Sequence, residues 1–370
     1  MGKYGTLVLV GLLATGEALA QSSVGGSNSS GSSVTLFGVV DAYVAYGTGS
    51  AGSRLALLSG GNAASRLGFR GAEDLGGGLS AGFWLEAGFD ADNGTGVSGS
   101  INNQPSGATP GDVISFNRRA TVSVFDLWGE LRLGRDFTSI YRNRDQTDPF
   151  NTNGVGGSQV QAGTIGGPTV TRASNMIGYF IPPGLGGFFG EVQYFMGENI
   201  QFHPAITPNT KAGDGYGGRI GWSAGPFGIA VAAQTTKFSQ TSTTGDIDSA
   251  NVGAYYDFTV VKLTASYFQD KVKSFVPVKG TGYIFGAVVP VFGVDQLKLA
   301  YSSYGTDEIT DPHANKFAIG YVYNFSKRTA AYATYAHVDN KGNSAFALNG
   351  SLTRPGRSSS GYDLGLRHSF

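Results

Sequence analysis

Apolar and polar residues alternate one by one along most of this chain. In the segment 33–46 the apolar side chains, among them Val34, Leu36 and Val44, share one parity, while Asp41 and Tyr43 take the other. The segment 79–90 repeats the pattern. A repeat of two residues is that of a β-strand whose side chains point to opposite faces. The chain is therefore predicted to be all-β, with one apolar and one mixed face on each strand.

Short turns and longer polar loops separate these segments in alternation. Turns such as 74–78 and 224–226 alternate with polar stretches such as 90–115 and 339–359. Short turns at one rim and long loops at the other are typical of outer-membrane barrels. Strands are expected at 33–46, 63–73, 79–90, 116–124, 129–136, 172–180, 188–198, 215–223, 227–238, 248–256, 260–270, 280–289, 294–304, 315–324, 329–339 and 360–370.

The end of the chain favours a closed barrel over a soluble sandwich, which alternation alone would also fit. The last segment alternates up to the final residue, Phe370, and such a strand can pair with the first strand and so remove both sheet edges. Sixteen strands enclose an aqueous channel, whereas eight are filled by their own side chains. The prediction is a 16-stranded antiparallel transmembrane β-barrel with short periplasmic turns and long extracellular loops. Lumen-facing charged candidates are Asp41, Arg66, Arg70, Glu86, Arg119 and Arg132.

Aromatic residues near the strand ends are candidates for the two belts that a membrane barrel presents to the lipid headgroups. The candidates are Tyr43, Tyr46, Phe188, Tyr194, Tyr255, Tyr256, Tyr321, Tyr323, Tyr332 and Tyr335.

Composition narrows the functional classes. The 26 basic and 26 acidic residues balance, so no basic field for nucleic acid is expected. The chain has no cysteine and only four histidines, which are scattered and lie outside any nucleophile motif. We therefore expect no metal, no cofactor and no catalytic role.

The first twenty residues have the features of an export signal. Lys3 provides a positive start, an apolar stretch spans 7–13, and Ala18-Leu19-Ala20 before Gln21 matches a cleavage site. The expected division of the chain is a signal peptide at 1–20, a flexible Ser/Gly-rich lead at 21–32 and the barrel at 33–370.

Several stretches together resemble one family. They are Ser33-Val34-Thr35-Leu36-Phe37-Gly38-Val39-Val40-Asp41, Ser65-Arg66-Leu67-Gly68-Phe69-Arg70-Gly71, Ala81-Gly82-Phe83-Trp84-Leu85-Glu86, Arg132-Leu133-Gly134-Arg135, Gly320-Tyr321-Val322-Tyr323-Asn324-Phe325 and the terminal Leu366-Arg367-His368-Ser369-Phe370. In this order, over essentially the whole mature chain, they resemble the trimeric general-diffusion porins of Gram-negative outer membranes, in the branch typical of β-proteobacteria.

The resemblance implies a homotrimer, embedded among outer-membrane lipids and lipopolysaccharide, that passes ions and small hydrophilic solutes by passive diffusion. It also implies that the third loop, at about 137–171, folds inward and narrows the pore. Matched to the family pattern, the constriction would carry Arg66, Arg118 and Arg172 on the barrel wall and the acids Glu86 and Asp148 opposite.

Two points stay open at this stage. Arg118 neighbours Arg119, and only one of two adjacent residues on a regular strand can face the lumen, so a bulge or a loop position for Arg118 is required. The excess of arginine suggests a preference for anions. The alternative function is a substrate-specific channel for a sugar or an organic anion, since Phe37, Tyr43, Trp84 and Phe189 have lumen parity and could stack on a sugar.

Overall fold

A computed structural model describes residues 32–200 and 210–370. The expected signal peptide at 1–20, and the expected lead at 21–32 except its last residue, lie outside the described residues. Within the described ranges, no helix is both long enough and apolar enough to cross a membrane.

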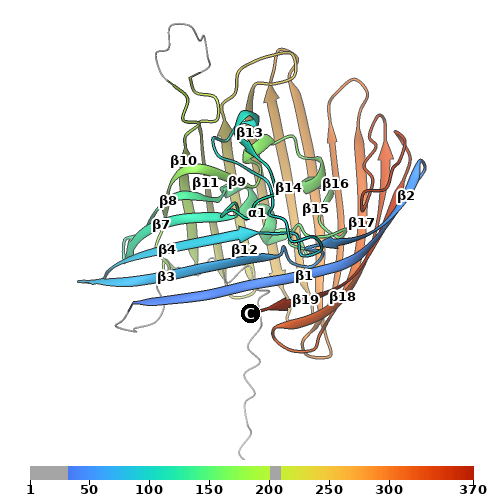
Figure 1. Ribbon diagram of the computed structural model, residues 1–370. Coiled ribbons are helices and arrows are strands. Elements are labelled where there is room, and N and C mark those ends of the chain that lie inside the picture. Colours follow the sequence, from blue (N-terminus) through green and yellow to red (C-terminus); the bar gives the residue numbers. More distant parts are fainter. Residues whose placement is uncertain (1–31, 201–209) are drawn as a thin grey trace, which may run out of the picture.

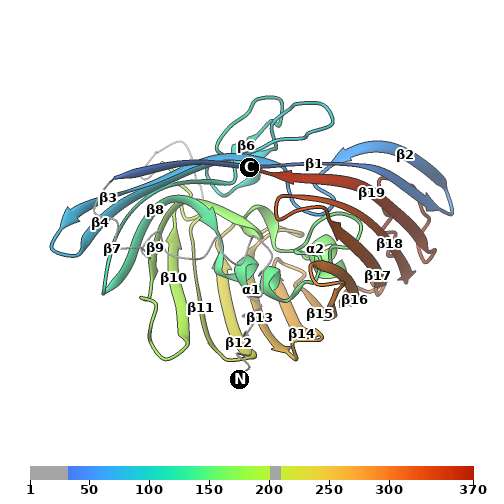
Figure 2. The ribbon, with the colours of Figure 1, turned by 90° about the horizontal axis from the view of Figure 1, so that it is seen from below.

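Antiparallel strands form one large closed sheet (Figures 1 and 2). The sheet closes because β1 pairs with β19, with Val44 opposite Leu364, while β9 pairs with both β8 and β10. Its strands are β1 (Ser33–Gly49), β2 (Gly52–Ser59), β3 (Arg66–Gly76), β4 (Leu79–Gly88), β7 (Arg119–Asp126), β8 (Gly129–Phe137), β9 (Arg172–Phe180), β10 (Phe188–Phe195), β11 (Gly215–Ala224), β12 (Phe227–Thr236), β13 (Asp246–Asp257), β14 (Lys262–Lys273), β15 (Val278–Val291), β16 (Asp295–Thr306), β17 (His313–Asn324), β18 (Thr329–Lys341) and β19 (Ser359–Ser369).

These seventeen strands occupy sixteen positions around the barrel, because β2 and β3 lie end to end along the same edge of β1. The predicted 16-stranded antiparallel barrel is confirmed. One expectation was wrong: residues 52–59 were expected in a loop. They pair instead with residues 42–49, the C-terminal half of β1, and form a long hairpin with it. The second strand is then interrupted at residues 60–65.

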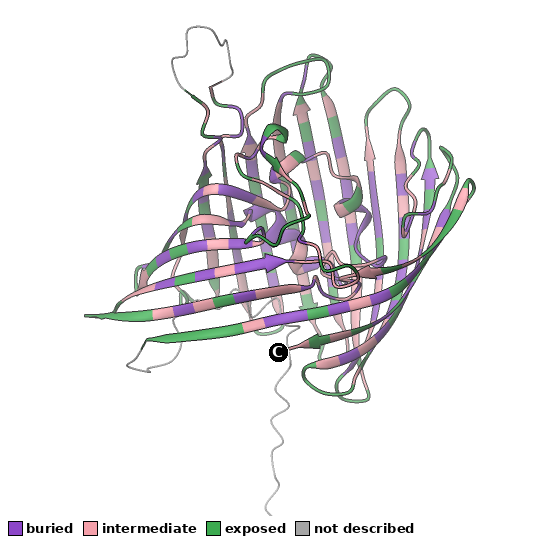
Figure 3. Ribbon diagram, viewed as in Figure 1, coloured by how far each residue is buried: buried purple, intermediate pink, exposed green. Residues whose placement is uncertain are grey.

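The two faces of the strands differ as the alternation predicts. In β1, Val34 is 71% exposed on the outside, whereas Asp41 is fully buried on the inside. Figure 3 shows the same alternation of exposed and buried residues along strand after strand. The apolar exterior suits the hydrocarbon of a bilayer. A closed barrel can cross this region because its backbone N–H and C=O groups are paired between neighbouring strands.

Aromatic side chains form contacts along both rims of the exterior. Near the long loops, Tyr362 lies with its ring centroid 4.9 Å from that of Tyr335 and 6.2 Å from that of Tyr46. Near the short turns, Trp128 stacks on Tyr179 at 6.3 Å. Three of the expected belt residues were assigned to the wrong face. Tyr43 and Tyr332 are buried on the lumen side, packed against each other. Tyr255 has the parity of Asn251 and Gly253, which face the lumen in β13.

Helical segments lie inside the barrel rather than around it. Helices α1 (Ser139–Thr147) and α2 (Gln159–Gly163) and the short η3 (Gly167–Thr169) belong to the connection between β8 and β9, and α1 and α2 are seen within the ring of strands in Figure 2. The connection between β4 and β7 holds a small two-stranded sheet of β5 (Gly99–Ser100) and β6 (Ala108–Thr109), with η2 (Pro105–Gly107) between them.

The outward face should reject charge much more strongly than the lumen face. Val231, in the middle of β12, is exposed on the outside, whereas Ser80 of β4 has lumen parity. A lysine at the bilayer midplane of such barrels costs about 2–4 kcal/mol. We expect Val231→Lys to lower the free energy of unfolding in lipid vesicles by roughly this amount and Ser80→Lys to change it little. Equal tolerance of the two lysines would contradict the assignment of faces.

Candidate pore constriction

Residues 138–171, here called the inner loop, are tied to most of the wall from β10 to β19. Backbone and side-chain groups of the loop bond to residues on seven different strands. The pairs include Ser139 N to Gln193 Oε1 (3.0 Å), Asn143 Nδ2 to Asn251 Oδ1 (2.7 Å), Gln159 N to Ser302 Oγ (2.7 Å), Thr164 Oγ1 to Asp270 Oδ2 (2.6 Å), Val155 N to Asp363 Oδ2 (2.7 Å), Thr169 Oγ1 to Thr236 Oγ1 (2.7 Å) and Lys316 Nζ to the carbonyl oxygen of Val155 (2.9 Å). A loop held at so many points is a fixed part of the lumen.

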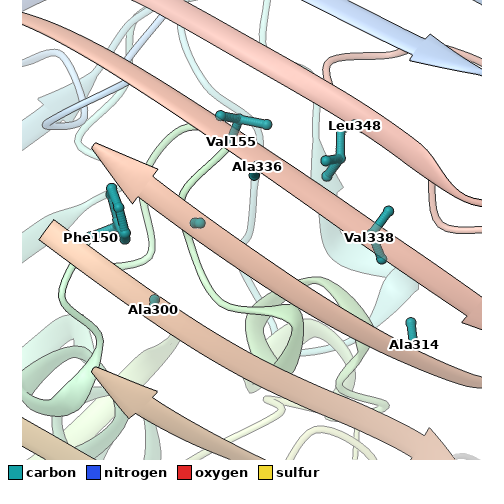
Figure 4. Close-up of a cluster of buried hydrophobic side chains, with 8 residues drawn as sticks. Phe150, Val155, Ala300, Ala314, Ala336, Val338 and Leu348 are labelled. Carbon is teal, nitrogen blue, oxygen red and sulfur yellow. The ribbon is translucent and has the colours of Figure 1, made fainter. Parts of the chain in front are cut away.

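An apolar cluster fastens the middle of the inner loop to the wall (Figure 4). Phe150 and Val155 are buried there with Ala300, Ala336, Val338 and other small residues of β16, β17 and β18. Small wall residues leave room for the large ring of Phe150 and allow close packing.

Two wall glycines make this packing possible. A Cβ atom on Gly286 would overlap Cγ of Pro149, and one on Gly320 would lie 2.7 Å from the ring of Phe150. Side chains at these lumen positions would push the loop away from the wall. The width of the remaining passage therefore depends on glycine at particular positions of β15 and β17.

Asp148 lies inside the loop rather than at its surface. Its carboxylate accepts the backbone N–H groups of Phe150 (2.9 Å) and Ser158 (2.8 Å), and the residue is only 3% exposed. The family resemblance implied that Asp148 faces the arginines across the gap. In the structure its carboxylate instead holds the backbone of its own loop.

The other four predicted constriction residues come together on the opposite wall. Glu86 of β4 accepts from Arg118 at 2.5 Å and lies 3.9 Å from Arg66 of β3. Arg172, the first residue of β9, donates from Nε to the carbonyl oxygen of Arg118 at 3.0 Å. Two guanidinium groups thus share one carboxylate, and the third, that of Arg172, lies beside them on the backbone of Arg118. The group of three arginines and one acid keeps an excess of positive charge.

The adjacent arginines both point inward because only one of them is in a strand. Arg118 directly precedes β7, and Arg119 is its first residue. The sequence required either a bulge or a loop position for Arg118, and the structure has the loop position.

A second charged group surrounds Asp136 at the end of β8. Its Oδ2 lies 2.5 Å from Arg132, 2.8 Å from Arg142 and 3.8 Å from Arg119. Glu130 adds a further contact to Arg132 at 2.8 Å. Because Arg142 belongs to α1, this group joins the inner loop to the wall. Sequence reasoning missed Arg142, since nothing in the chain order shows that α1 meets β8.

A fourth acid of this wall, Glu191 of β10, was also missed. It lies 3.3 Å from Arg219 of β11 and 4.0 Å from Arg142. Lumen parity would have found both wall residues, because Glu191 and Arg219 face each other in the register of β10 and β11.

Aromatic rings hold several of these guanidinium groups in place. Arg119 lies 4.4 Å and Arg70 5.1 Å from the ring centroid of Trp84. Arg132 lies 4.0 Å from the ring centroid of Phe180, Arg172 4.3 Å from that of Phe137, and Arg219 5.0 Å from that of Phe189. Stacked in this way, an arginine keeps its charge while losing little freedom on ordering.

Asp41, a predicted lumen residue, and Arg144, a residue of the inner loop, are both bonded to backbone groups. Asp41 accepts backbone N–H groups of residues 61–63 and so holds the break between β2 and β3. Arg144 of α1 is buried and donates to the carbonyl oxygen of Val170 at 3.3 Å, and burial lowers the pKa of its guanidinium.

A closed barrel with an apolar exterior, a charged lumen and a loop fixed inside it defines an outer-membrane channel. The profile of the Gram-negative porin family matches residues 5–343. The chain is 35% identical to outer membrane porin protein 32 of Delftia acidovorans, over 100% of both chains, and 28% identical to an outer membrane porin protein of Bordetella pertussis, over 99% of both.

Solved structures agree. An anion-selective porin from Comamonas acidovorans superposes with a TM-score of 0.78 at 36% identity, over 92% of this chain and 100% of that chain. The chain belongs to the Gram-negative porin family. It is an integral outer-membrane protein of Gram-negative bacteria that forms a channel for passive diffusion.

Substitution of Gly286 by valine should displace the inner loop, because the added side chain needs the space of Pro149. We expect a changed single-channel conductance and greater current noise in planar bilayers. Ala287→Val is the matched control, since the next residue along the strand points to the outer face. If the Gly286 variant folds and conducts like the control, the loop is not seated as described.

Proposed function

We propose that the channel prefers anions. The observation that carries this proposal is the charge balance at the wall opposite the inner loop, where Arg66 and Arg118 share the single carboxylate of Glu86 and Arg172 bonds to the backbone of Arg118. The similarity to a porin whose structure is described as anion-selective supports it.

Fixed charge acts on permeant ions most strongly where the aqueous gap is narrow. Low-dielectric walls focus the field of the arginines into the water, which raises the local concentration of anions and lowers that of cations. Hydration and carboxylate partners keep the guanidinium groups charged. The other acids described on this wall, Glu130, Asp136 and Glu191, already lie against arginines, which reduces the field they present to cations.

A sugar-specific channel is less well supported. Stacking on a sugar needs an open aromatic face, yet Trp84 is flanked by Arg70 and Arg119, and Phe189 is covered by Arg219. Tyr43 is buried against Tyr332. An organic anion would fit the same arginines, and the channel then differs from a general porin only in how tightly it holds the solute.

The proposed role is conduction without catalysis. The three histidines in the described part of the chain bond to neighbouring polar groups: His313 to Ser303 and Asn315, His337 to Ser360 and Asp339, and His368 to Thr329. His337 does link Ser360 to Asp339, but these three side chains lie on the outward face of β18 and β19, and that of Asp339 is 65% exposed. They are therefore outside the lumen through which solutes pass.

The proposed assembly is a homotrimer surrounded by outer-membrane lipids and lipopolysaccharide. A structure of similar fold, from Vibrio cholerae, is described as a trimer form, with a TM-score of 0.65 at 13% identity. The solutes proposed to pass are small hydrophilic molecules and inorganic or organic anions.

Removal of residues 1–20 on export is also proposed, on the basis of the Ala18-Leu19-Ala20 site. Mass spectrometry of the protein isolated from outer membranes should give an N-terminus at Gln21. An N-terminus at Met1 in that preparation would show that the segment is retained.

The charge proposal makes a measurable prediction for Arg172. A unit charge acts on an ion about 7 Å away in water with about 0.6 kcal/mol, a factor of roughly three in occupancy. Because chloride occupancy falls and potassium occupancy rises, Arg172→Gln should lower the chloride-to-potassium permeability ratio by up to roughly sevenfold, as read from the reversal potential in a KCl gradient. Arg354→Gln, in the loop before β19, is the control and should leave the ratio unchanged. Cation preference in the native channel would refute the proposal.

A further inference from the structure

The break between β2 and β3 contains more residues than the barrel needs. Ala42 of β1 lies opposite Ser59, and Val39 lies opposite Arg66. Two residues of β1, 40 and 41, therefore face six residues, 60–65, and 6 − 2 leaves four residues in excess. A regular strand cannot hold them, so they leave the plane of the sheet as a turn.

Asp41 pulls this turn toward the lumen. Its buried carboxylate accepts the consecutive N–H groups of Gly61 (3.2 Å), Asn62 (3.0 Å) and Ala63 (2.8 Å). The hydroxyl of Tyr332, on the lumen face of β18, donates to the same carboxylate. Because the side chain of Asp41 points inward, the turn that it binds must lie inside the barrel.

The turn meets the inner loop. A Cβ atom on Gly154 would overlap the carbonyl oxygen of Gly61, so the two backbones are in direct contact. The carboxamide oxygen of Asn62 accepts from Lys298 Nζ at 3.4 Å, and that ammonium lies 5.7 Å from the ring centroid of Phe150. The turn, the loop tip and Lys298 form one continuous structure.

This contact crosses the lumen instead of following the wall. Lys298 belongs to β16, and β17, β18, β19 and β1 lie between it and the break. Neighbouring strands are about 4.8 Å apart, so the two residues are separated by roughly 24 Å along the wall. On the lumen side of the bridged strands, Lys316, Tyr332 and Asp363 are buried. The bridge therefore closes this sector of the cross-section.

We propose that the 60–65 turn is a second element of the pore constriction, with Asn62 lining the solute path and Asp41 as the positioning residue that holds the turn inward. The inference rests on the proposed function and adds a specificity residue to it. Because the oxygen of Asn62 faces Lys298, its N–H donors are directed to the opposite side, where they suit the oxygen atoms of carboxylate or phosphate groups. The turn also positions Arg66, which donates to the carbonyl oxygen of Ala64 at 3.0 Å.

Deletion of residues 61–64 tests the proposal directly. It removes the four excess residues and lets Gly60 and Ser65 pair with the two facing residues of β1. We expect a folded, heat-modifiable barrel with a larger single-channel conductance than the native protein. The matched control deletes residues 240–243, four residues of the exposed loop between β12 and β13, and should keep the native conductance. Native conductance in the folded 61–64 deletion would overturn the proposal.

Cysteine labelling gives a second readout that does not depend on refolding a deletion. The chain has no cysteine, so a single introduced thiol is the only reactive one. Modification of Asn62→Cys by a bulky methanethiosulfonate during recording should reduce the conductance in a step. Ser242→Cys, in the exposed loop, should be labelled without such a step. Labelling of Asn62→Cys with unchanged current would place residue 62 outside the path.

The sign of the charge at position 62 separates this proposal from the anion preference itself. Asn62→Asp should lower the chloride-to-potassium permeability ratio, and Asn62→Lys should raise it, each by up to roughly sevenfold for ions at about 7 Å. A native channel without anion preference would refute the proposed function. An anion-preferring channel whose ratio ignores both substitutions would refute only the role of the turn.

Discussion

The requirement that every backbone N–H and C=O be paired within the bilayer governs this structure. No water is available in the hydrocarbon region, so a sheet can cross it only when its first and last strands meet. The pairing of β1 with β19 meets that requirement and brings the C-terminal strand beside the N-terminal one. Once the ring is closed, side-chain alternation sends apolar residues to the lipid and polar ones to the lumen, and the charged passage follows from that division.

Charge inside the lumen is kept by local partners. Arginines lie on aromatic rings such as Trp84 and Phe180, and carboxylates such as Asp136 are each shared by several guanidinium groups. These contacts hold the cations close to one wall, while the inner loop occupies the other. The passage is thus asymmetric in charge and in shape, although the barrel that contains it is regular.

Sequence reasoning predicts the barrel well because alternation is a local property. The expected strands match the observed ones within a few residues at most positions, and the inward faces of Asp41, Arg66, Glu86 and Arg119 follow from parity. Contacts between distant segments could not be read in this way. The burial of Asp148 within its own loop and the contact of Tyr332 with Asp41 depend on how the chain returns to itself across the barrel.

The fit of Phe150 against Gly320 bears on how such a channel can change over generations. The loop contributes a large side chain, Phe150, at the point where the wall has only a glycine, Gly320. A larger wall residue is tolerated only after the loop has lost its ring, and a smaller loop residue leaves a void until the wall grows. The two positions that set the pore width must therefore change together during evolution. A sequence in which only one of them has changed is less stable.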